Sequence, residues 1–87
     1  MMPLTRVPKQ PVLRMTSIRF LMKDGEWELI CSISTRTLMA FGARWGMQDA
    51  QMVFWAYQDE IERAASDKYD RTGRKDYAIL HIDEDDL

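Results

Sequence analysis

Two stretches of alternating apolar and polar residues flank the dipeptide Asp24-Gly25, and this arrangement constrains the fold more than any other feature of the chain. Residues 18–23 alternate before the dipeptide, and residues 26–33 alternate after it. A period of two places successive side chains on opposite faces of a strand, and Asp-Gly suits the positive φ angles of a tight turn. The sequence therefore predicts a β-hairpin.

Two helices are predicted after the hairpin. Ser34 can cap the first, its apolar residues recur at helical spacing as far as Trp45, and Gly46 can end it in a left-handed conformation. Asp49 can begin a second, continuous helix that runs to Tyr69 and carries an apolar stripe along one side.

A third strand is expected over residues 77–82, where apolar residues alternate again. Neither a sheet nor an amphipathic helix can bury its apolar side alone. We therefore expect a two-layer α+β fold of order β-β-α-α-β, with a three-stranded, mostly antiparallel sheet covered on one face by two helices. Residues 16–82 would form this single domain, between an extended, proline-rich basic arm (1–15) and an acidic C-terminal tail (83–87).

Several turn, cap and core positions between residues 18 and 69 form a recognisable set: Arg19-Phe20, Asp24-Gly25, Cys31-Ser32-Ile33-Ser34, Leu38, Phe54, Ile61, Ala64-Ala65 and Tyr69. In these positions the chain resembles the bacterial family known as Domain of Unknown Function 1488. Where the long helix of that family often carries an arginine, this chain has Gln58. The resemblance implies an α+β fold of about this size, and it implies no accepted activity, cofactor or catalytic residue.

Few residues here are suited to catalysis. Cys31 is the single cysteine, which excludes an internal disulfide and a multi-cysteine zinc site, and it shares the apolar face of the hairpin, where a thiol is unreactive. His81 is the single histidine and is interpreted as a surface residue. Arg19 is expected to face Glu26 or Glu28 across the hairpin. We expect no catalytic residue, no cofactor and no metal site, and therefore no enzyme activity.

Apolar residues exceed what the predicted core requires. Met52 and Trp55 widen the stripe of the second helix, while Leu21, Ile30 and Ile79 fall on the sheet face that the helices leave open. Met and Trp are enriched at protein interfaces, although the same residues can pack within the domain or lie scattered on its surface. The leading expectation is a non-catalytic interaction or accessory module that forms a homodimer or docks a protein partner.

The charge distribution supports an alternative. The net charge is −2, but residues 1–23 carry +5, residues 24–75 carry −2 and residues 76–87 carry −5. A basic arm and a basic loop can bind nucleic acid weakly and without sequence specificity, although the acidic balance of the whole chain disfavours it. The phosphate contacts in this alternative are Arg6, Lys9, Arg14, Arg71, Arg74 and Lys75.

No membrane partner is expected. The longest apolar run, residues 52–57, has six residues, whereas a membrane-spanning helix needs about 20. Pro3, Pro8 and Pro11 interrupt the opening segment, which predicts no secretory signal. With one thiol and no export signal, a cytoplasmic location is expected.

Overall fold

The predicted hairpin is confirmed. In the computed structural model, which describes residues 4–72 and 79–87, strand β3 (Ser17–Asp24) pairs antiparallel with β4 (Trp27–Ser34). The turn between them is Gly25-Glu26, one residue later than the expected Asp24-Gly25, because Asp24 pairs with Trp27. Gly25 alone in this turn has a positive φ, of 61°, which a residue without a Cβ atom adopts readily. The buried side chains of the hairpin alternate, and so they share one face: Ile18, Phe20, Met22, Leu29, Cys31 and Ile33.

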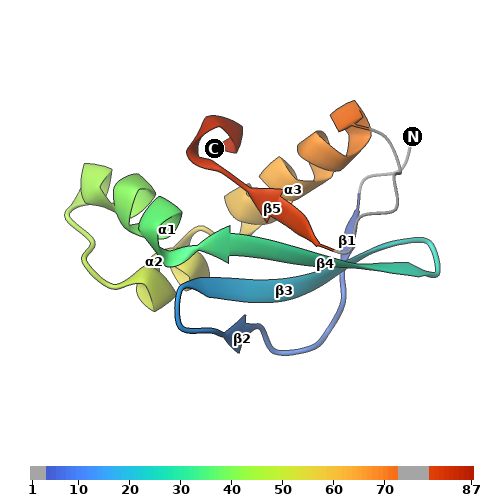
Figure 1. Cartoon of the computed structure of the whole chain (residues 1–87), viewed down its shortest axis with the longest axis horizontal. Helices are drawn as coiled ribbons and strands as arrows, with labels where there is room; N and C mark the ends of the chain where they lie inside the picture. The colour runs from blue at the N-terminus through green and yellow to red at the C-terminus, as the bar shows by residue number, and fades with distance from the viewer. Residues whose placement is uncertain (1–3, 73–78) are drawn as a thin grey trace.

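The α+β class is also confirmed, but the sheet has more strands than the three predicted. Five strands are found in the described residues: β1 (Thr5–Arg6) and β2 (Val12–Leu13) both pair antiparallel with β3, and β5 (Leu80–Ile82) pairs with β4. Figure 1 shows β2, β3, β4 and β5 side by side in that order. The β4–β5 pair is parallel, because the intervening helices return the chain to the end at which β4 began. Of the predicted last strand, residues 77 and 78 lie outside the described residues.

Residues 4–13 belong to the folded domain, which differs from the expected arm. Leu4 and Val7 are buried. The backbone N–H of Leu4 donates to Oγ of Ser66 at 3.0 Å, and that of Val7 donates to the carbonyl of Leu21 at 3.2 Å. Strands of two residues carry no readable alternation, so their pairing depends on distant parts of the chain.

The first helix begins and ends as predicted. Helix α1 (Thr35–Gly42) is capped by Ser34, whose Oγ accepts a hydrogen bond from the backbone N–H of Thr37 at 3.0 Å. A short 3-10 turn, η1 (Ala43–Trp45), continues it and ends at Gly46, which has a φ of 73°.

The second helix is not continuous, so the prediction of two helices is wrong. Asp49 caps α2 (Ala50–Ala56) as expected, but α3 (Gln58–Thr72) follows after a break at Tyr57, where φ is −119° and ψ is 27°. The Tyr57 ring stacks on Trp45, with ring centres 4.8 Å apart. This contact joins the bend between α2 and α3 to η1.

The helices cover one face of the sheet. Leu38, Phe54 and Ile61 come from α1, α2 and α3, and all three pack with the apolar face of the hairpin in one core. Phe54 approaches Phe20 of β3 with ring centres 5.4 Å apart. None of the helices in the described part of the chain covers the opposite face of the sheet.

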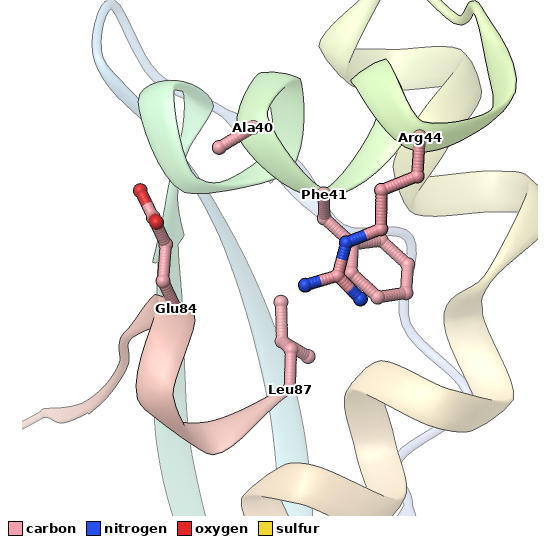
Figure 2. A pocket seen from close by; sticks show the side chains of 5 residues that line it. All are labelled: Ala40, Phe41, Arg44, Glu84 and Leu87. Carbon is pink, nitrogen blue, oxygen red and sulfur yellow. The ribbon is translucent and has the colours of Figure 1, made fainter.

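The C-terminal segment, expected as a solvated tail, forms a 3-10 turn, η2 (Glu84–Asp86), that packs beside α1 and α3. The Asp86 side chain is 7% exposed and lies 2.9 Å from Nζ of Lys68 and 3.0 Å from Nη2 of Arg71. In Figure 2, residues of α1, η1 and the C-terminal segment surround a small cavity, which has a volume of about 40 Å³. Such a volume holds about one water molecule and no larger ligand. Its lining residues are Ala40, Phe41, Arg44, Glu84 and Leu87.

Candidate docking surface on the open face of the sheet

Pairing register brings one row of four side chains together across the open face. Val12 of β2 lies opposite Arg19 of β3, Arg19 lies opposite Ser32 of β4, and Ser32 lies opposite His81 of β5. Residues that are directly opposite in a sheet project from the same face. The row therefore runs from an apolar edge, through a cation and a hydroxyl, to an imidazole.

Arg19 does not face Glu26 or Glu28, so that prediction is wrong. The Gly25-Glu26 turn fixes the register, which pairs Lys23 with Glu28 and Arg19 with Ser32. Nε of Arg19 is buried and has no hydrogen-bond partner within the described chain. A buried donor of this kind is costly to leave unpaired, because its hydration has been lost without replacement.

Beside this row lies an open depression of about 230 Å³, here called the Arg19 groove. Its floor is formed by Leu21 and Ile30, which lie opposite each other, and Ile30 is 39% exposed. Three of its residues are cations, and none is a carboxylate. The lining residues are Lys9, Gln10, Val12, Arg14, Arg19, Phe20, Leu21 and Ile30.

The five residues predicted as a protein interface do not form one surface. Leu21 and Ile30 meet in the Arg19 groove, whereas Ile79 is half-buried and does not line it. Met52 and Trp55 are 62% and 49% exposed on α2, which packs against the other face of the sheet.

Trp55 of α2 lies near β2. Leu13, which is 54% exposed, lines a small hollow together with Trp55. Met52 is one helical turn before Trp55 and therefore on the same side of α2. We call Leu13, Met52 and Trp55 the α2 patch. Sequence reasoning missed the roles of Val12 and Leu13 because the segment that contains them was interpreted as an arm.

The six cations expected to contact phosphate are divided among several environments. Arg6 binds Glu62 and Asp59 of α3, and Arg71 binds Asp86. The ion pairs with Glu62 and Asp59 also keep the pKa of Arg6 above its ordinary value, although burial opposes the effect of these pairs. Lys9 and Arg14 line the Arg19 groove, while Arg74 and Lys75 lie outside the described residues. Within the described chain, these cations do not form one phosphate-binding patch.

Cys31 and His81 lie on opposite faces of the sheet. Cys31 pairs in register with Leu80 on the core face, whereas Ser32 pairs with His81 on the open face. Cys31 is 0% exposed, and burial raises the pKa of its thiol to about 12, with a further contribution from the charge of Glu62. This arrangement separates the thiol from the imidazole that a nucleophile–base pair would require.

Other kinds of site find little support in the described ranges, residues 4–72 and 79–87. There, no group of three His, Cys, Asp or Glu side chains is placed to hold a metal ion. No helix in the same ranges is long and apolar enough to cross a membrane. No family model, curated protein or solved structure matches the chain.

Proposed function

We propose that the protein is a non-catalytic interaction module that docks an acidic segment of a protein partner in the Arg19 groove. The observation behind this proposal is an apolar floor, formed by half-buried Leu21 and exposed Ile30, that Lys9, Arg14 and Arg19 border. Apolar contact would supply binding energy, and the cations would select and orient carboxylates on the partner.

Charge supports a different protein over a second copy as the occupant of this groove. In a two-fold symmetric dimer each patch meets its own equivalent, so the three cations of one groove would approach those of the other. Like charges across an interface are unfavourable. An acidic partner removes this repulsion.

Affinity capture from source cells tests the proposal with matched baits. Ile30→Asp places a carboxylate in the groove, whereas Met52→Asp makes the same change on the α2 patch. A partner that docks in the groove is captured by the wild type and by Met52→Asp, is lost with Ile30→Asp, and is released as salt rises. Capture that is equal with all three baits would contradict the proposal.

Self-association through the α2 patch is the second candidate. The hollow beside Trp55 is lined by residues without formal charge: Pro11, Leu13, Ile18, Gln51, Phe54 and Trp55. Two uncharged patches can meet without repulsion, unlike two Arg19 grooves. Light scattering over a range of concentrations tests this candidate: a dimer that Trp55→Asp dissociates and Ile30→Asp preserves supports it, and a monomer throughout contradicts it.

Nucleic-acid binding is the less favoured candidate, because Arg6 and Arg71 are engaged with carboxylates of the same chain. It would depend on Lys9 and Arg14 together with Arg74 and Lys75, which lie outside the described residues. A mobility shift that survives Lys9→Gln with Arg14→Gln would implicate Arg74 and Lys75.

A bacterial origin and a cytoplasmic location are also proposals. The first rests on the resemblance to the Domain of Unknown Function 1488 family, and the second rests on Cys31, a lone and fully buried free thiol. Proteins of oxidising compartments more often pair their cysteines.

A further inference from the structure

Arg19 also borders a second depression, on the side away from Leu21 and Ile30. This depression has a volume of about 320 Å³ and is formed where β3, β4 and β5 lie side by side. Polar side chains dominate its lining, in contrast to the apolar floor of the Arg19 groove. Those that bear on ligand binding are Ser17, Arg19, Ser32, His81 and Asp83.

These side chains supply several hydrogen-bond donors within a short span. Arg19, Ser32 and His81 are consecutive in register, and adjacent strands lie about 4.8 Å apart, so the three Cα atoms span about 10 Å. Ser34 also lines the depression, but its Oγ already accepts from the N–H of Thr37 and donates to Oγ1 of Thr37. Residues with guanidinium, hydroxyl and imidazole groups therefore line one open space.

We propose that this depression binds a phosphate monoester. The guanidinium fork matches two phosphate oxygens, and the hydroxyls of Ser17 and Ser32 and the ring of His81 supply donors for the others.

Asp83 is the carboxylate at the rim, and its charge opposes an anion. Its Oδ2 lies 3.5 Å from Nζ of Lys68, which partly compensates that charge, and the side chain is 72% exposed. The opposing charge is therefore both solvated and paired, whereas Arg19 lies at the centre of the sheet face.

The proposal that phosphate binds here depends only on these residues. The proposal that the phosphate belongs to a phosphorylated residue of the docked partner also depends on the proposed function. The two proposals can therefore fail separately. Phosphate can bind at Arg19 in a protein that captures no partner, and a partner can dock in the groove of a protein that binds no phosphate.

Titration with inorganic phosphate, followed by amide NMR shifts and matched against chloride at equal ionic strength, tests the site. We expect saturable shifts at Ser17, Arg19, Ser32 and His81. Arg19→Gln should weaken binding about tenfold or more, since loss of one charged hydrogen-bonding group has about that effect. Arg36→Gln removes the same charge from an exposed position on α1 and should leave binding unchanged.

The dispersion of the spectrum reports whether each variant is folded. If Arg19→Gln fails to fold, Ser32→Ala and His81→Gln provide the same test, each with an expected severalfold loss. Shifts that do not saturate, or a folded Arg19→Gln variant with unchanged affinity, would overturn the inference. A short acidic phosphoserine peptide that binds more tightly than inorganic phosphate assigns the group to a protein partner, whereas equal affinity assigns it to a small phosphate-bearing molecule.

Discussion

Arg6 and Glu62 form a two-point ion pair that ties the first strand to α3. Nε of Arg6 donates to one carboxylate oxygen at 2.7 Å, and Nη2 donates to the other at 2.8 Å. At the far end of α3, Lys68 binds Asp86. The opposite charges of the two chain ends, which nearly cancel in the total, therefore each find partners on the same helix.

We expect a coupling of about 1 kcal/mol between Arg6 and Glu62. Exposed ion pairs usually contribute less than this to the free energy of unfolding. This pair has two hydrogen bonds, which strengthen it, and the Glu62 side chain is only 13% exposed. A double-mutant cycle of Arg6→Ala and Glu62→Ala, measured by urea unfolding, gives the coupling. A value near zero would mean that apolar burial of Leu4 and Val7 alone holds the first strand.

Acid should weaken the contacts of the C-terminal turn. Burial acts to raise the pKa of Asp86, but the Asp83 amide, Lys68 and Arg71 together hold it below its ordinary value of 3.8. A carboxylate whose pKa is lower in the folded state than in the unfolded state stabilises the fold fully above the unfolded-state pKa. This stabilisation is lost as pH falls through the folded-state pKa.

Below about pH 4, the urea concentration at the unfolding midpoint should therefore decrease more steeply with falling pH for the wild type than for Asp86→Asn. At neutral pH the variant should be less stable by about 1 kcal/mol, because charged hydrogen bonds are lost. Parallel curves for the two proteins would contradict the assigned role of Asp86.

Cys31 should resist alkylation in the folded protein. The thiol is fully buried and its pKa is raised to about 12, so almost no thiolate exists at neutral pH. Iodoacetamide should label urea-unfolded protein quickly and leave native protein unlabelled over the same time, as followed by mass spectrometry. Rapid labelling of native protein would show that Cys31 is accessible and reactive.

Gly42→Ala should destabilise the protein, although alanine favours helices over glycine by about 1 kcal/mol. A Cβ at Gly42 would overlap Cγ2 of Val53 and lie 3.2 Å from Cβ of Met47. Overpacking of this kind costs about 1–3 kcal/mol. In a Val53→Ala background the same change should be neutral or stabilising, and thermal unfolding of the four proteins compares the two effects.

Local signals in the sequence predicted the hairpin and the helix starts. Asp24-Gly25, Ser34 and Asp49 act through bonds to residues within a few positions, so their effect is readable from the chain alone. The facing partner of Arg19 was not readable in this way, because counting outward from Asp24-Gly25 gives Ile30, whereas the observed Gly25-Glu26 turn places Ser32 opposite.

Contacts between distant residues were not readable in this way. The break at Tyr57 has no proline or glycine to mark it, and its ring is held by Trp45 and Phe41 from the preceding helical segment. Strands β1 and β2 depend on pairing with β3, and the segment around β1 is also held by bonds from Leu4 and Arg6 to Ser66 and Glu62 of α3. The Arg19 groove combines both kinds of contact, so only its Leu21 and Ile30 floor was predicted.

Selection of a displayed random peptide library against the purified protein tests the central claim, docking of an acidic segment in the Arg19 groove, most directly. We predict that enriched peptides carry Asp or Glu beside apolar residues, and that both Ile30→Asp and Arg19→Gln abolish their binding while Met52→Asp does not. Enriched peptides without acidic residues, or peptides that bind Ile30→Asp as well as the wild type, would contradict the claim.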